Sequence, residues 1–223
     1  MSRYEAVILD VDGTLVYSNE LHARAWVDAL AESGREADLD RVVRLIGMGG
    51  DKVLPELTGL EEESEEGGRI LERRGEIFKE RYLDEVRAVP GVRDLLVRLR
   101  EMGMRLMVAT SAGEPMLEPL LNAAGVRDLI DDATSSSDAD ASKPDPDIVA
   151  AALEKVDVPR DRVVMLADTP YDLEACERLG LDMIAFRTGG WTDRDFPAAL
   201  AIYEDAAELL ANLDESPLGG RAA

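Results

Sequence analysis

The sequence predicts an α/β protein in which a parallel β-sheet with helices on both faces carries an inserted, all-helical segment. Three observations support this prediction. The apolar, β-prone run 7–9 ends at Asp10 and Asp12, and a glycine then breaks the strand. Residues 17–86 show helical periodicity without a further strand pattern. From Pro90 onward helix and strand patterns alternate, which implies parallel strands joined by helical crossovers.

The pattern divides the chain of 223 residues into one large domain, an insertion and a tail. The sheet-containing core is expected to comprise residues 1–16 and 87–213. The helical insertion is expected to comprise residues 17–86. Residues 214–223 are expected to form a loose C-terminal tail, because the last eight contain one Pro and two Gly.

The expected helices and strands are bounded by residues that favour the ends of such elements. Glycines follow the apolar stripes of several helices and are placed to end them. The strands expected after the first are 104–109, 129–133, 162–167 and 183–186. The expected helices have their apolar positions within 21–30, 39–46, 53–60, 70–82, 92–102, 115–124, 148–156, 173–179 and 206–213, and 47–52 is expected to be a flexible loop.

The net charge restricts the partners of the protein. Lys and Arg total 25 against 47 Asp and Glu, which gives a formal net charge of -22. Such a charge repels polyanions, so nucleic acid and anionic membranes are excluded as partners. A small phosphate ester remains a possible ligand where a local cation and a few basic groups overcome the long-range field.

The cysteine content and the N-terminus indicate a compartment. Cys176 is the only cysteine, so neither an intrachain disulfide nor a zinc–thiolate cluster is expected, which suits a reducing environment. Residues 1–5 lack the apolar segment of a signal peptide, and no apolar run approaches the roughly 20 residues that span a bilayer. The sequence therefore predicts a cytoplasmic protein, and we expect a monomer or a homodimer.

Polar residues follow several strands of the predicted sheet. Because the carboxyl ends of parallel strands meet at one edge, residues distant in sequence can converge there on one pocket. An isolated Asp-x-Asp-Gly is equally well an acidic turn that closes a strand, so the later residues decide between the two interpretations. The residues at strand ends are Asp10 and Asp12, Thr110 with Ser111, Lys143 in its loop, and Asp168 with Asp172.

In order and spacing, these residues resemble the motifs of the haloacid dehalogenase-like hydrolase superfamily. The first motif is Asp10-x-Asp12-Gly13-Thr14-Leu15, followed by Thr110, Lys143 and Asp168-Thr169-x-x-Asp172. The helical insertion is similar to the cap domain of the subfamily that contains phosphoglycolate phosphatase and β-phosphoglucomutase. The resemblance implies a three-layer, Rossmann-like core and a phosphatase acting on a small phosphorylated metabolite, such as a sugar phosphate or phosphoglycolate.

The resemblance also assigns roles that agree with the chemistry of each residue. Asp10 is expected to be the nucleophile that forms an aspartyl-phosphate, and Asp12 the acid that protonates the leaving alcohol. Mg²⁺ is expected on Asp10, the backbone carbonyl of Asp12 and Asp168, which are hard oxygen ligands. Asp172 is expected to belong to the metal site as well, where it orients Lys143 or a metal-bound water.

Three residues complete the expected substrate contacts within the core. Thr110 and Ser111 are expected to bind the phosphate group, and Lys143 to neutralise charge on the phosphoryl group and on Asp10. Taken alone, each has an ordinary structural explanation, because threonines end strands, lysines are solvated and Asp172 favours the start of a helix.

The insertion supplies the candidates for substrate choice. Lys52 is the basic residue of the loop 47–52. Arg74 precedes Phe78 by four positions on a helix. His22, the only histidine, is a candidate for positioning Asp12, although a lone His on an amphipathic helix is more often structural. Arg74 is equally well a solvated residue of a charged helix.

Some positions depart from the pattern of the superfamily. Tyr17 stands where relatives often carry Asp, and Ala167 stands where some relatives carry a second carboxylate before the metal ligand. The sugar-phosphate mutases carry an Arg close to the position that Gly50 occupies in this chain, and the absence of that Arg weakens a phosphohexomutase interpretation. The alternatives to a phosphatase are therefore a phosphomutase of the β-phosphoglucomutase type and a non-catalytic, ligand-binding member of the fold. A dehalogenase is less expected, because its chemistry needs neither Asp12 nor a metal.

Overall fold

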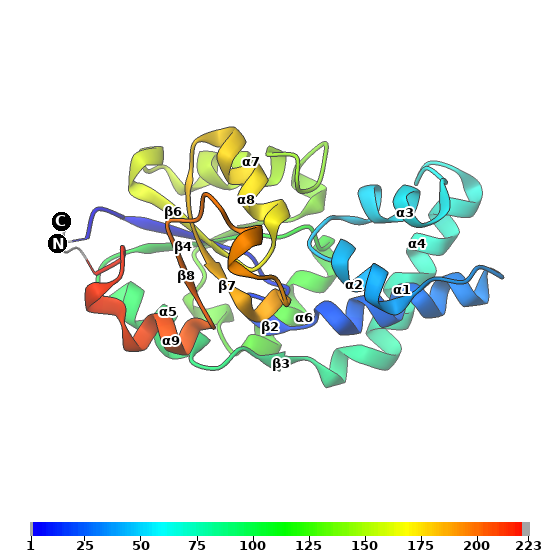
Figure 1. Ribbon diagram of the computed structural model, residues 1–223, viewed down its shortest axis with the longest axis horizontal. Helices are drawn as coiled ribbons and strands as arrows, with labels where there is room; N and C mark the ends of the chain where they lie inside the picture. The colour runs from blue at the N-terminus through cyan, green and yellow to red at the C-terminus, as the bar shows by residue number, and fades with distance from the viewer. Residues whose placement is uncertain (1, 220–223) are drawn as a thin grey trace.

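The computed structural model describes residues 2–219 and has the expected three-layer α/β architecture (Figure 1). Its central sheet contains six parallel strands in the order β5-β4-β1-β6-β7-β8. Chain order runs outward from β1 in both directions, so the topological switch point lies beside this strand. The strands are β1 (Ala6–Leu9), β4 (Arg105–Ala109), β5 (Asp132–Thr134), β6 (Val163–Ala167), β7 (Asp182–Phe186) and β8 (Ala201–Tyr203).

Helices cover both faces of the sheet, because alternate side chains of each strand point to opposite sides. Val7 and Leu9 pack with the helices α5 (Val92–Glu101), α6 (Glu114–Ala124) and α9 (Ala206–Ala211). Ala6 and Ile8 pack on the other face with α7 (Asp147–Val156) and α8 (Pro170–Leu179). None of the helices in the described residues is long and apolar enough to cross a bilayer.

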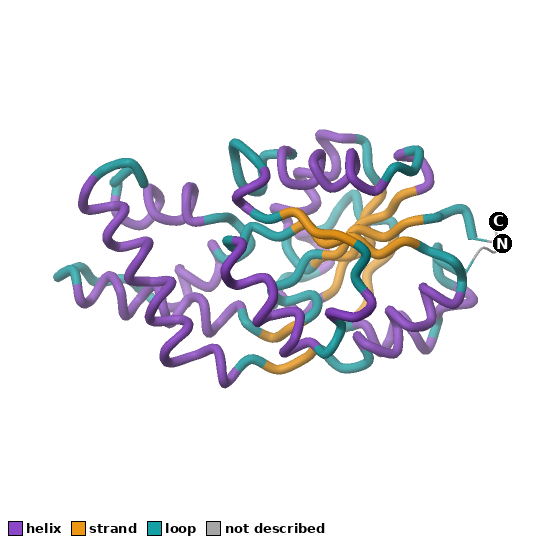
Figure 2. Tube along the Cα trace, turned by 180° about the vertical axis from the view of Figure 1, so that it is seen from behind, coloured by secondary structure: helices purple, strands orange, loops and turns teal. Residues whose placement is uncertain are grey.

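The remaining helices lie beyond one end of the sheet (Figures 1 and 2). They are α1 (Asn19–Glu32), α2 (Leu39–Leu45), α3 (Gly50–Thr58) and α4 (Glu65–Ile77), which continues through a π-helical turn (Phe78–Tyr82) and a 3₁₀ turn (Leu83–Glu85).

An antiparallel ribbon of β2 (Val16–Tyr17) and β3 (Arg87–Ala88) joins these helices to the sheet, with Val16 opposite Ala88. Each strand has only two residues, which are too few to produce a strand pattern, so the ribbon was not expected from the sequence. Tyr17, expected in the helical segment, lies in β2 instead. Because both chain crossings lie side by side here, we propose the ribbon as the boundary between a core domain (1–16, 87–213) and a cap domain (17–86).

Several element bounds differ from the sequence expectations for identifiable reasons. Helix α8 begins at Pro170 rather than 173, because Thr169 caps it with a side chain that accepts from the Asp172 backbone N–H. The loop expected over 47–52 ends earlier, since α3 already begins at Gly50. Strand β8 was not expected, because its three residues are too few to show alternation.

The described part of the expected C-terminal tail is packed against the core. Leu218 is fully buried and belongs to the larger apolar cluster, and Ser216 is buried beside it. The Ser216 hydroxyl donates to the Leu213 carbonyl at 2.7 Å and accepts from the Leu218 N–H at 3.1 Å, which closes a turn. The expectation of a loose tail over 214–223 is therefore wrong for residues 214–219, and 220–223 lie outside the described residues.

Candidate active site

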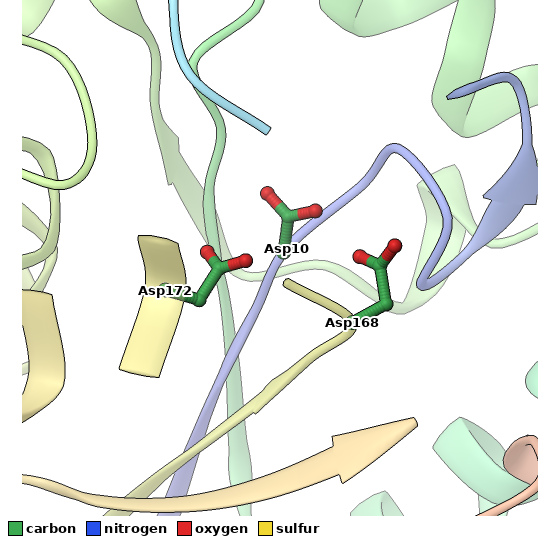
Figure 3. A group of neighbouring side chains, drawn as sticks. All are labelled: Asp10, Asp168 and Asp172. Carbon is green, nitrogen blue, oxygen red and sulfur yellow. The ribbon is translucent and has the colours of Figure 1, made fainter. Parts of the chain in front are cut away.

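The predicted strand-end residues meet at the carboxyl edge of the sheet, beside the switch point. Figure 3 shows Asp10 after β1, Asp168 after β6 and Asp172 in the first turn of α8, with their carboxylates side by side. One oxygen of each lies within 4.8 Å of the others, and all three residues are buried. Three buried carboxylates this close repel one another unless cations lie among them.

Lys143 supplies one of these cations. Its Nζ lies 2.6 Å from Oδ1 of Asp10 and 2.6 Å from Oδ1 of Asp172, and it donates to the Ala109 carbonyl at 2.8 Å. Burial alone would lower the pKa of Lys143, but the carboxylates of Asp10 and Asp172 raise it above its ordinary value. Lys143 therefore stays charged although it is fully buried.

The Asp10 side chain is an unusually weak acid for an aspartate. Burial raises its pKa to about 7, with further increases from Asp172 and Asp12, against the opposing effect of Lys143. The second carboxylate oxygen of Asp172, by contrast, accepts from the Thr169 hydroxyl at 2.6 Å. An additional cation beside Asp10 would favour its ionised form near neutral pH.

Asp168 is held by neutral donors from the first motif and from α1. Its Oδ1 accepts from the Thr14 hydroxyl at 2.9 Å, and its Oδ2 accepts from the Asn19 amide at 2.9 Å. Burial, Asp10 and Asp172 raise the pKa of Asp168, and these hydrogen bonds oppose the rise. Because its partners are neutral, the charge of Asp168 is not compensated by a nearby basic group.

The surroundings of Asp168 fit a divalent cation. A Cβ at Gly13, which has a φ of +78°, would lie 1.9 Å from Oδ2 of Asp168, and one at Gly189 would lie 2.4 Å from it. Only glycines permit such close approach to this oxygen. Hard carboxylate oxygens are the ligands that Mg²⁺ prefers, so Asp10 and Asp168 suit this ion. Both oxygens of Asp172 already face Lys143 and Thr169.

Asp12 points away from this group toward α1. Its Oδ1 accepts from the Ser18 hydroxyl at 2.5 Å and lies 2.9 Å from Nε2 of His22. The His22 ring stacks on Phe78 with centroids 3.8 Å apart, which fixes its orientation. Burial alone would raise the pKa of Asp12, but His22, Ser18 and Arg74 together lower it below its ordinary value.

Two neighbouring cavities lie at this site. The inner one has a volume of about 40 Å³ and is bordered by Asp10, Asp12 and His22. It has room for roughly three water molecules, which is the size scale of a phosphoryl group. The outer one, of about 510 Å³, lies between the helical insertion and the core. Arg74 and Ser111 border both cavities, so they stand where the two meet.

Arg74 is a cation directed into the site and not engaged by a carboxylate. Its guanidinium lies 5.2 Å from the centre of the Trp26 ring, and its Nε is buried without a hydrogen-bond partner in the described part of the chain. Burial lowers its pKa, and Asp12 opposes this. Within residues 2–219 no salt bridge involves Arg74, which leaves it available to an anionic ligand.

The structure does not bring Lys52 into the inner cavity. Lys52 instead forms an ion pair with Asp145 at 2.7 Å. This pair, with the bond from the Gly49 N–H to the Ser142 hydroxyl at 2.9 Å, ties the insertion to the Lys143 loop. Thr110 is buried after β4, and its hydroxyl accepts from the Ala112 N–H at 3.0 Å.

Three contacts at the site were missed by reasoning from the sequence. The hydroxyl of Ser18, just before α1, donates to Asp12. Asn19 and Thr14 both hold Asp168, although Thr14 was recognised only as part of a motif. The polar sequence Ser18-Asn19 before an apolar helix gives no separate signal for these roles, because the same residues are ordinary helix starts.

Together, the switch-point location, the buried Asp10–Lys143 pair and the neighbouring carboxylates define an α/β protein with a buried, charged site at the carboxyl edge of its sheet. A family model described as haloacid dehalogenase-like hydrolase matches residues 7–186. The chain belongs to the haloacid dehalogenase-like hydrolase family. The expected fold and the expected enzyme class, a phosphoric monoester hydrolase, are thereby confirmed.

Individual relatives agree with this membership. The chain is 30% identical to a phosphoglycolate phosphatase of Nitrosospira multiformis over 219 residues, which cover 95% of this chain and 93% of that protein. The crystal structure of CbbY from Rhodobacter sphaeroides in complex with phosphate has a TM-score of 0.79 and 31% identity, covering 95% of this chain and 99% of the other. The chain also matches the SUPPRESSOR OF QUENCHING 1 protein of Arabidopsis thaliana at 31% identity, but covers only 18% of that longer protein.

Proposed function

We propose that this hydrolase is a Mg²⁺-dependent phosphatase that acts on a small phosphorylated metabolite through an aspartyl-phosphate on Asp10. The observation that carries the proposal is the position of Asp10, buried beside Lys143 at the border of a cavity that fits a phosphoryl group. The phosphoglycolate phosphatase and the phosphate-bound CbbY among its relatives support the same class of ligand.

In this proposal the residues around Asp10 divide the chemistry. Asp10 attacks phosphorus, and Lys143 balances charge on Asp10 and on the phosphoryl oxygens. Asp12 donates a proton to the leaving alcohol and later accepts one from the hydrolytic water. The bond from phosphorus to the alcohol oxygen breaks first, and water then cleaves the bond to Asp10, so phosphate and the free alcohol are released.

Asp10, Asp168 and the carbonyl of Asp12 would hold Mg²⁺, which supplies charge neutralisation between the attacking carboxylate and the anionic phosphate. The chain's own charge makes this necessary, because a net charge of -22 disfavours approach of a phosphate ester. Asp172 orients Lys143, with which it pairs at 2.6 Å. Thr110 and Ser111 remain proposed phosphate contacts.

The cavities support a small substrate that carries a further polar group near the phosphate. The inner cavity accommodates little more than the phosphoryl group, so the rest of the substrate extends past Arg74 and Ser111 into the outer cavity. Arg74 is placed to bind a hydroxyl, carboxylate or second phosphate there. His22 contributes by holding Asp12.

The experiment is phosphate release from an aryl phosphate and a panel of sugar phosphates and phosphoglycolate, with Mg²⁺ or with a chelator, for wild type and Asp10→Asn. We expect release that needs Mg²⁺ and is lost in Asp10→Asn. Conversion of a sugar phosphate into its isomer without net phosphate release, and only in the presence of a bisphosphate primer, would identify a phosphomutase instead. Tight ligand binding without release from any ester would identify a non-catalytic member of the fold.

A further inference from the structure

The first turn of α1 contacts two different carboxylates of the site. Ser18 and His22 contact Asp12, whereas Asn19, between them, reaches Asp168. Asn19 is the first residue of α1 and therefore belongs to the inserted helices, while Asp168 follows a strand of the core sheet. The bond of 2.9 Å between them joins residues 149 positions apart in the sequence.

The backbone at Gly13 makes this bond possible. A Cβ there would lie 1.9 Å from Oδ2 of Asp168 and 2.6 Å from Nδ2 of Asn19, and the φ of +78° is itself one that glycine favours. Gly189 also approaches this oxygen closely, since a Cβ there would lie 2.4 Å from Oδ2 of Asp168. The amide and the carboxylate are thus brought together in a space that any other residue at position 13 would fill.

The second polar atom of the Asn19 side chain is also informative. Its Oδ1 is buried and has no hydrogen-bond partner among the residues described. Asn19 does not cap α1, because the N-cap position is occupied by Ser18, which makes no side-chain capping bond. A buried amide oxygen without a partner needs an explanation, and solvent held beside Asp168 would supply the missing donor.

We propose that Asn19 is a positioning residue for the divalent cation of the proposed phosphatase: its Nδ2 fixes the Asp168 carboxylate, and its Oδ1 accepts a hydrogen bond from solvent in the same site. Thr14 restrains the other oxygen of Asp168, so the carboxylate cannot rotate. A ligand held in one orientation binds a metal without first losing rotational freedom. The inference rests on the Mg²⁺ dependence proposed above.

The test is calorimetric titration of Mg²⁺ into the metal-free protein. We expect Asn19→Ala to weaken Mg²⁺ binding by about ten- to a hundredfold, the usual effect of losing a residue that orients a metal ligand. Asn19→Ser, whose hydroxyl is shorter and still favours a helix start, should show the same loss. Glu20→Gln is the matched control, because Glu20 lies in the same turn of α1 but is exposed and pairs with Arg24; its Mg²⁺ affinity should equal that of wild type.

Phosphate release gives a second measurement that a folding defect would not reproduce. Raising the Mg²⁺ concentration should restore the kcat of Asn19→Ala toward that of wild type, because only occupancy of the site is reduced. Equal Mg²⁺ affinity in wild type and both Asn19 variants would overturn the inference. Failure of the proposed function is distinguishable from this, since wild type itself would then bind no Mg²⁺ or release no phosphate.

Discussion

Lys143 Nζ lies 2.6 Å from Oδ1 of Asp10, and both side chains are buried. Asp172 faces the same ammonium at 2.6 Å. A buried ion pair contributes little net stability when it is compared with apolar groups, but the loss of one partner leaves an uncompensated charge. Lys143 therefore holds together the two carboxylates that would otherwise repel each other.

Lys143→Gln is expected to destabilise the protein by about 3–5 kcal/mol at neutral pH, because Asp10 and Asp172 then remain buried without a cation. Urea denaturation measures this change, and phosphate release should fall with it. Lys155→Gln is the control, since Lys155 forms a half-exposed ion pair with Asp138 at 3.1 Å and should cost no more than about 1 kcal/mol. Equal stability of the two variants would contradict a structural role for Lys143.

Asp10→Asn is expected to gain stability relative to wild type as the pH rises, in the metal-free protein. The folded chain raises the pKa of Asp10 to about 7, from an ordinary value of 3.8. The stabilisation of the folded state by the neutral Asp10 side chain is therefore fully present below about pH 4 and is lost as the pH rises through about 7. Asn has no proton to lose, so the difference in free energy of unfolding should change by on the order of 1 kcal/mol or more. Denaturation at several pH values with a chelator measures it; a difference independent of pH would refute it.

The core of the site could be predicted from the sequence because its residues sit at strand ends. Asp10, Lys143 and Asp168 each follow a pattern that a parallel sheet places at one edge, and the structure brings them together. The ribbon of β2 and β3 could not be predicted, since four residues carry no periodicity. The buried position of Leu218 was also hidden, because a Pro- and Gly-rich sequence resembles a loose tail whether or not it packs.

The cap residues show the limit of sequence reasoning more directly. Lys52 and Arg74 were equal candidates as cations, and only the folded chain separates them: Lys52 pairs with Asp145, whereas Arg74 borders both cavities. Lys52 is neutralised by Asp145, a residue 93 positions away in the sequence, so its pairing depends on the folded structure. No local pattern encodes such a partner.

His22→Leu is expected to move the alkaline limb of the kcat/KM profile to higher pH, because the proposed general acid Asp12 must be protonated to serve the leaving alcohol. His22 lowers the pKa of Asp12, so its removal lets burial raise that pKa. The loss in kcat should stay below the roughly 10²–10⁴-fold contribution of general acid–base catalysis, because Asp12 itself remains. Arg24→Gln, an exposed residue of the same helix paired with Glu20, is the control and should leave the profile unchanged. An unchanged profile in His22→Leu would exclude a positioning role.

Arg74→Gln is expected to raise KM more than it lowers kcat. The guanidinium is placed to bind the part of the substrate beyond the phosphoryl group, so kcat/KM should fall by roughly ten- to a hundredfold, as for the loss of a charged hydrogen bond. Steady-state kinetics on the best substrate of the panel measures this. Arg73→Gln is the control, because Arg73 pairs with Glu32 and Glu76 on the outer face. Equal KM in the two variants would remove Arg74 from the substrate site.

Leu218→Ala is expected to lower the free energy of unfolding by about 2–5 kcal/mol, the range for removing a fully buried leucine side chain. The cost arises because the chain after Leu213 folds back and places Leu218 in the apolar cluster on the α5–α9 face of the sheet. Leu200→Ala makes the same chemical change at a side chain that is 44% exposed, so it should alter stability by no more than about 0.5 kcal/mol. Thermal and urea denaturation of both variants measure the contrast. A similar, small effect at the two positions would mean that residues 214–219 do not pack against the core in solution.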